Sequence, residues 1–141
     1  MSELAVLGCT LAASLDEGVG TISATLAPAS MPSQYVLAEG KGVYFDKLVV
    51  TVGAGSSVAV SPPPGASSGT GTLAAADTID ILGTAENILD LPSENKAVQK
   101  GDKGSKILTF TFPATGGGTV TAPYNVTVEV TEAGQTSVIA S

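Results

Sequence analysis

The segment Tyr124-Asn125-Val126-Thr127-Val128-Glu129-Val130-Thr131 alternates apolar and polar side chains without a break. Because successive side chains of a β-strand point to opposite faces, the tyrosine and the three valines share one face. Valine, threonine and tyrosine also fit a pleated, half-buried surface. The segment therefore predicts a strand that lays one face on a hydrophobic core.

Two further segments, Thr21–Leu26 and Ile107–Phe112, alternate in the same way. No segment of ten or more residues combines a helical period with helix caps. The sequence therefore predicts an all-β protein, with residues 1–141 forming one small domain of short antiparallel hairpins. A compact sandwich is one arrangement that such hairpins adopt.

Loops are marked by glycine, serine and proline. Gly116-Gly117-Gly118 stands between two threonine-rich strands and predicts a hairpin connection. The segment Gly53–Thr72 is rich in glycine and serine and contains three successive prolines, which favours a long exposed loop. Four of the six lysines fall between Lys96 and Lys106, a pattern typical of a solvated loop.

Composition excludes several classes of function. The chain has no histidine, which removes Ser-His-Asp and Cys-His catalysis and histidine-ligated metals. Its formal net charge is −7, with no arginine, which argues against nucleic-acid binding and against attraction to anionic membranes. No run approaches the roughly 18 apolar residues of a membrane span. We expect a non-enzymatic protein without cofactor or metal and without stable membrane anchoring.

The first residues carry Glu3 and neither lysine nor arginine, unlike a secretory signal. We therefore expect synthesis in the cytoplasm without a signal peptide. The single cysteine, Cys9, cannot form an internal disulfide, and we expect it to act as a small buried hydrophobic residue.

Two short stretches of the chain match patterns that carry chemistry in other proteins. The segment Gly65-Ala66-Ser67-Ser68-Gly69 matches the G-x-S-x-G nucleophile motif, but that chemistry needs a histidine base and a strand-to-helix turn. Oxygen atoms of Asp77, Asp80, Glu86 and Asp90 could serve calcium, although their spacing matches no calcium loop. Neither motif carries a site prediction.

Two units of the chain resemble each other, one over residues 35–47 and one over residues 87–103. Each reads as a strand, a polar turn that ends in lysine, and a second strand. Such a pair is typical of a domain built from repeated hairpins. The apolar residues expected in the core of these units are Val36, Leu37, Val43, Ile88, Leu89 and Val98.

The segments Val36-Leu37-Ala38-Glu39-Gly40-Lys41 and Ala85-Glu86-Asn87-Ile88-Leu89, the latter followed by residues 96–102, resemble the repeat unit of PAAR and PAAR-like proteins. The opening Val6-Leu7-Gly8-Cys9-Thr10-Leu11 is similar to the start of such proteins. The resemblance covers residues 4–106 in patches and leaves out Gly53–Thr72 and Ile107–Ala140.

The resemblance implies a small cone-like β-domain that caps the end of a trimeric β-helical spike in a contractile injection apparatus, such as a type VI secretion system or a phage tail. The partner would be the spike trimer, with effector cargo as a further partner, and the domain would aid membrane puncture. After synthesis the chain would be assembled into the apparatus and delivered outside the cell. Family members bind zinc through histidines and a cysteine, and this chain has no histidine for that site.

A second hypothesis comes from a different class of protein. The regular alternation of Tyr124–Thr131 also fits a self-associating β-sandwich in the coat or decoration layer of a virion or cell surface. Light scattering separates the two hypotheses, since only the second predicts assembly of the isolated chain.

Overall fold

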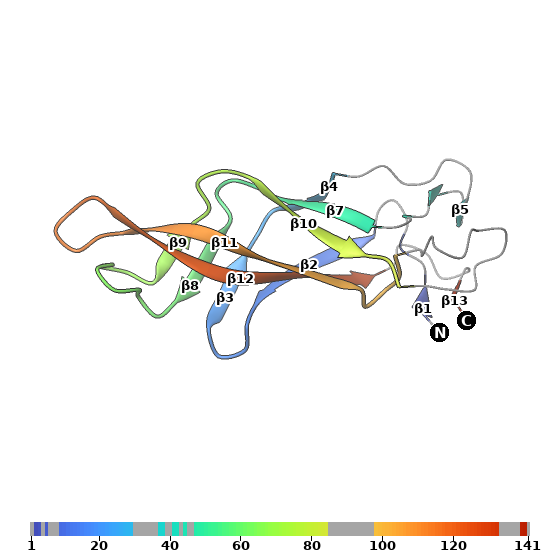
Figure 1. The fold of residues 1–141 in the computed structure, drawn as a ribbon, viewed down its shortest axis with the longest axis horizontal. Helices are drawn as coiled ribbons and strands as arrows, with labels where there is room; N and C mark the ends of the chain where they lie inside the picture. Colours follow the sequence, from blue (N-terminus) through green and yellow to red (C-terminus); the bar gives the residue numbers. More distant parts are fainter. Residues whose placement is uncertain are drawn as a thin grey trace.

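The computed structural model describes residues 5, 9–29, 44, 47–84 and 98–132, and the backbone alone of 2–3, 37–38, 41–42 and 139–140. Within these residues every regular element is a β-strand, and every ladder between strands is antiparallel (Figure 1). The prediction of an all-β fold is confirmed.

Nine of the described strands form the body of the protein: β2 (Thr10–Leu15), β3 (Gly20–Ser23), β4 (Leu26–Pro28), β7 (Lys47–Val52), β8 (Ser57–Val60), β9 (Thr70–Thr72), β10 (Asp77–Leu82), β11 (Lys103–Pro113) and β12 (Thr119–Glu132). Two short pairs of strands join β1 (Ser2–Glu3) to β13 (Ile139–Ala140) and β5 (Leu37–Ala38) to β6 (Lys41–Gly42).

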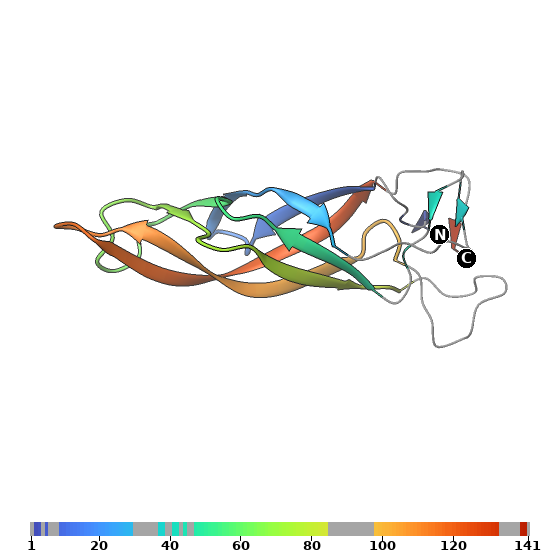
Figure 2. The same ribbon diagram turned by 90° about the horizontal axis from the view of Figure 1, so that it is seen from above.

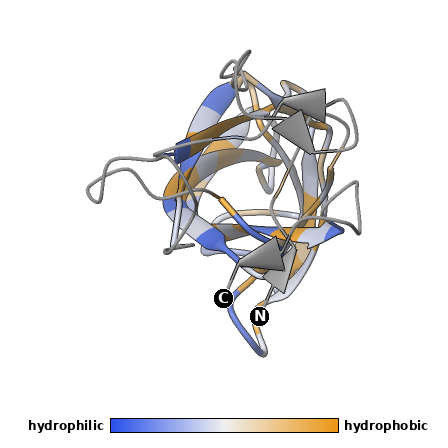
Figure 3. Ribbon diagram, turned by 90° about the vertical axis from the view of Figure 1, so that its right-hand side faces the viewer, coloured by the Kyte–Doolittle hydropathy of each residue, from blue (hydrophilic) through white to orange (hydrophobic). Residues whose placement is uncertain are grey.

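The nine strands follow one another around the body almost in chain order. One sheet has the order β2-β12-β11-β9-β8-β3, and a second has the order β10-β7-β4. Together they make an elongated, nearly closed, barrel-like body (Figures 1 and 2), with strands ringing the long axis when viewed from one end (Figure 3). Long antiparallel neighbours joined by short turns produce such a meander.

Three chain segments change sheet halfway along the body. They run as β3–β4, β7–β8 and β9–β10, and the first strand of each lies in a different sheet from the second. Ser56 sits at the changeover and is almost fully buried. Its Oγ donates to the Gly53 carbonyl oxygen at 2.7 Å and accepts from the Thr25 backbone N–H at 3.2 Å. The second bond gives the Thr25 backbone N–H a partner where the ladders are interrupted, and the first adds to the backbone bond from Ser56 N–H to the Gly53 carbonyl.

The core is aliphatic with a few aromatic rings. The inward residues of β11 and β12 alternate as their sequence predicts, and Leu108, Phe110 and Phe112 are fully buried. The Phe112 ring lies 6.0 Å from the ring of Tyr124, centroid to centroid, in a tilted arrangement. Rings at this distance and tilt stabilise each other beyond the area they bury.

The segment Gly53–Thr72 is not one long loop, as its composition predicts, because it contains β8 and β9. Gly71 explains part of the error. It is buried, and a Cβ at this position would lie 2.5 Å from the Phe112 ring. Glycine here permits close packing within a strand, whereas its usual meaning in a sequence is a turn.

At the end of the body farthest from the termini, two turns brace each other (Figure 1). The prediction of a hairpin at Gly116–Gly118 is confirmed, and all three glycines have positive φ. The proline-rich turn packs on this hairpin: the Ser67 N–H donates to the Pro113 carbonyl at 2.8 Å, and the Thr115 N–H donates to the Gly65 carbonyl at 2.9 Å. We call these two turns the distal end.

At the opposite end, three distant segments meet through a ring of backbone hydrogen bonds. Ala5 N–H donates to Val98 O, Val98 N–H to Tyr44 O, and Tyr44 N–H to Ala5 O, at 2.7, 2.9 and 3.2 Å. All three side chains are buried, so this ring closes the core. Of the core residues expected in the two similar units, Val98 lies here. The backbone of Leu37 lies in β5, and Val36, Val43, Ile88 and Leu89 lie outside the described residues.

Candidate interaction face along β10 and β11

β10 and β11 run side by side, but the described hydrogen bonds include no ladder between them. They touch where Gly104 faces Asp80, since a Cβ on Gly104 would overlap the Asp80 carbonyl oxygen. Farther along, β11 pairs with β9 at Thr111 and Thr72. Between these two points the strands form a seam that side chains bridge.

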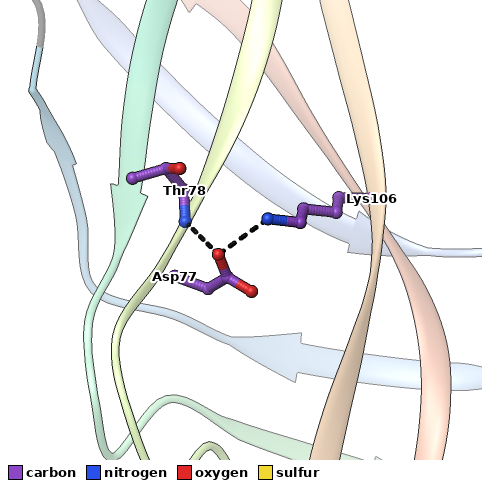
Figure 4. Close-up of polar contacts among 3 residues, drawn as sticks. All are labelled: Asp77, Thr78 and Lys106. Atoms are coloured by element: carbon purple, nitrogen blue, oxygen red, sulfur yellow. Dashed lines mark hydrogen bonds and ion pairs between the residues drawn. The ribbon is translucent and has the colours of Figure 1, made fainter.

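An ion pair crosses this seam (Figure 4). Lys106 Nζ donates to Asp77 Oδ1 at 2.8 Å, and the Thr78 backbone N–H donates to the same oxygen at 2.8 Å. Lys106 pairs with the buried Val126 in the β11–β12 ladder, so its side chain starts from the face of β11 that points to the core. About half of the side chain is nevertheless exposed, because the seam is open there. The Lys106 hydrogen bond, followed by that from Thr78, holds the pKa of Asp77 below its usual value.

Two more ion pairs flank the seam. Lys47 Nζ lies 3.5 Å from Asp80 Oδ2, and Lys103 Nζ lies 3.8 Å from Glu129 Oε1. With the pair at Asp77, three lysines and three carboxylates share this surface, which therefore has no net charge. The net charge of −7 resides on the rest of the chain.

A shallow groove of about 260 Å³ lies over the seam, lined by Thr78, Asp80, Ser105 and Lys106. Two large apolar side chains are exposed on the same strands: Leu82 on β10, 63% exposed, and Ile107 on β11, 66% exposed. They are the exposed large hydrophobic residues of the described part of the chain. We call the groove, the three ion pairs and these two side chains the β10–β11 face.

The predicted loop between Lys96 and Lys106 is wrong over its second half, because Lys103 and Lys106 lie on β11. Lysine on a strand projects its ammonium group away from the backbone while its methylene stem packs on neighbours. The solvent exposure predicted for these two lysines is correct, but they lie on a strand and not in a loop.

Asp102, which is 7% exposed, holds the end of the face where β10 ends and β11 begins, which we call the proximal end. Its carboxylate accepts from the Gln99 backbone N–H at 2.9 Å, from the Thr84 backbone N–H at 3.3 Å and from the Thr84 hydroxyl. Gln99 Nε2 also donates to the Thr84 hydroxyl at 2.9 Å. Asp102 thus ties the end of β10 to the turn before β11. The pattern Gln-x-x-Asp around a glycine could have identified this turn in the sequence.

Cys9 and Tyr44 lie near the end of the core that the Ala5, Tyr44 and Val98 hydrogen bonds close. Burial raises the pKa of the half-buried Cys9 thiol, which keeps it neutral and weakly nucleophilic. The Tyr44 side chain is 1% exposed, and its hydroxyl has no hydrogen-bond partner among the described residues. Burial, followed by the nearby Cys9, raises the pKa of Tyr44.

The two sequence motifs do not form a site in the described residues. Ser67 of the G-x-S-x-G match lies in the distal end, where its hydroxyl donates to the Pro113 carbonyl at 3.3 Å. Of the four possible calcium ligands, Asp77 and Asp80 are engaged by lysines, and Glu86 and Asp90 lie outside the described residues. Across residues 9–29, 47–84 and 98–132, no three acidic or cysteine side chains group closely enough to hold a metal ion.

No helix that is long and apolar enough to cross a membrane occurs in the part of the chain that the structure describes. A scan of family models finds no match to this chain, and neither curated proteins nor solved structures give a significant match.

Proposed function

We propose that this chain is a non-enzymatic structural protein that associates with copies of itself in the coat or decoration layer of a particle or cell surface. The observation that supports it is the distribution of charge. The β10–β11 face gathers the ion pairs and the exposed large apolar side chains of the described residues, at no net charge.

A net charge of −7 makes copies of the chain repel one another over most of their surface. A face of zero net charge that carries exposed apolar residues is where two copies approach at the lowest electrostatic cost. Multi-angle light scattering of the purified chain tests the proposal. We expect a mass above one chain that rises with concentration, and a single-chain mass at every concentration overturns it.

A second candidate, the spike-tip function, is favoured by the distal end. The two turns of the distal end and the strands that lead into them, over Gly53–Ala76 and Ile107–Val128, contain no charged residue. Charged side chains are costly to move into hydrocarbon, so an uncharged and mutually braced end suits a tip driven into a membrane. In this candidate the opposite end binds the trimeric spike, cargo travels with it, and the chain is delivered outside the cell.

The two candidates predict different behaviour of the isolated chain. A spike tip stays a single chain until it meets the spike trimer, with which it copurifies. A coat or decoration protein assembles alone. Light scattering, followed by copurification with a trimeric spike protein, therefore distinguishes them.

A further inference from the structure

We propose that the β10–β11 face binds the same face of a second copy, around a two-fold axis that runs parallel to the two strands along the seam. This inference rests on the proposed self-association and names the surface and the geometry that produce it.

The charges on the two strands select this axis. β10 carries Asp77 and Asp80 and no lysine, whereas β11 carries Lys103 and Lys106 and no carboxylate. Residues three apart on a strand point to opposite faces, so Asp80 and Lys103 lie on the outer face, whereas Asp77 and Lys106 pair with each other in the seam. A two-fold axis along the seam places β10 of each copy over β11 of the other, so Asp80 of each copy faces Lys103 of the other.

An axis perpendicular to the strands would place β10 over β10 and β11 over β11. Aspartate would then face aspartate and lysine would face lysine, which is unfavourable. The axis along the seam therefore places opposite charges against each other, whereas the perpendicular axis places like charges against each other.

The same axis brings the exposed apolar residues together. Leu82 and Ile107 lie on strands adjacent to the axis, so each meets its own counterpart in the second copy. Each is exposed by more than 60% in the single chain, so the contact removes apolar surface from water. The groove at Thr78 and Ser105 lies between them, where it provides polar groups at the centre of the contact.

The geometry is tested with single cysteines on a Cys9→Ser background, in which every disulfide must join two chains. Ile107→Cys and Leu82→Cys each place a cysteine against its own copy, so we expect each to form covalent dimers under mild oxidation. Thr121→Cys, at an exposed position of β12 away from the face, serves as the control and should stay monomeric on denaturing gels. If cross-linking required Leu82→Cys and Ile107→Cys in the same chain, the axis would run across the strands, contrary to the proposal.

The surface is tested with Ile107→Lys, Leu82→Lys and the control Thr121→Lys, compared by sedimentation velocity. Each variant lowers the net negative charge by one, so general repulsion between copies falls equally in all three. We expect Ile107→Lys and Leu82→Lys nevertheless to raise the dissociation constant at least about tenfold, and Thr121→Lys not to raise it.

Circular dichroism checks that all variants are folded, which we expect because the three positions are exposed. Association that is unchanged in Ile107→Lys and Leu82→Lys overturns this interface and leaves the proposed function standing. A wild-type chain that stays monomeric at every concentration overturns both.

Discussion

The distal end and the β10–β11 seam solve the same structural problem in different ways. At the distal end, β11 and β12 continue their ladder to Pro113 and Thr119, and neighbouring turns add backbone hydrogen bonds. At the seam the ladder is missing in the described hydrogen bonds, and Lys106 and Asp77 bridge the gap. Strands that pair through backbone hydrogen bonds are held together without charged side chains. At the open seam, charged side chains that are also exposed to water connect the two strands.

This difference predicts where mutations cost most. The Phe112 ring, which lies just before the distal hairpin turn, is fully shielded from solvent, so the loss of its packing is fully felt in the free energy of unfolding. Ion pairs at the seam are half-exposed and therefore contribute little stability. The stability of the body should depend on its core far more than on its charges.

The largest effect is expected for Phe112→Ala. The ring is fully buried and packs against Gly71 and Tyr124. Its removal should lower the free energy of unfolding by about 3–5 kcal/mol, from lost burial and the cavity left behind. Urea unfolding at pH 7 measures this. Ile107→Ala, which truncates an exposed residue of the same strand, should change the free energy of unfolding of the monomer by less than about 0.5 kcal/mol.

Asp102→Ala should be the most damaging change at the proximal end of the seam. It leaves the backbone N–H groups of Gln99 and Thr84, whose hydrogen bonds are partly buried, without their acceptor, which costs about 1–3 kcal/mol. Asp80→Ala is the matched control, because that carboxylate is half-exposed and makes a 3.5 Å ion pair. Equal losses from the two variants, measured by thermal unfolding, would contradict a special role for Asp102.

Gly71→Ala tests whether close packing explains the glycine in β9. The added Cβ meets the Phe112 ring, and overpacking of a core typically costs about 1–3 kcal/mol. Phe112→Leu removes the part of the ring that clashes. In the double variant Gly71→Ala/Phe112→Leu the loss should be smaller than the sum of the two single losses, as a double-mutant cycle would show. If the two losses in the free energy of unfolding were strictly additive, contact with Phe112 would not explain the glycine at position 71.

The sequence predicts the elements that have one buried face and misses those where packing overrides composition. The alternation at Tyr124–Thr131 and Ile107–Phe112 is a direct consequence of burial, so β11 and β12 could be predicted. Gly71 and the three prolines have meanings that depend on distant neighbours, Phe112 and the β11–β12 hairpin, and a local pattern cannot reveal these.

The β10–β11 face was missed for a similar reason. Asp77, Asp80, Lys103 and Lys106 are separated by more than 20 residues between the two pairs, and only the antiparallel course of β10 and β11 brings them together. The opposite charges of β10 and β11 are visible in the sequence, but they become informative only once the two strands are known to be neighbours.

The smallest effect is expected for Lys106→Gln, and its dependence on pH identifies its origin. The pKa of Asp77 is lower in the folded chain than its usual value of 3.8, so the charged carboxylate stabilises the fold. That contribution is complete above pH 3.8 and is lost as the pH falls through the lower pKa of the folded state. Because the pair is half-exposed, Lys106→Gln should cost at most about 1 kcal/mol at pH 7, and less in high salt. The difference between wild type and variant in urea unfolding should shrink toward zero as Asp77 becomes protonated. Lys100→Gln removes the same charge from an exposed turn and should show no such trend, and a difference that grew on acidification would contradict the role of the ion pair.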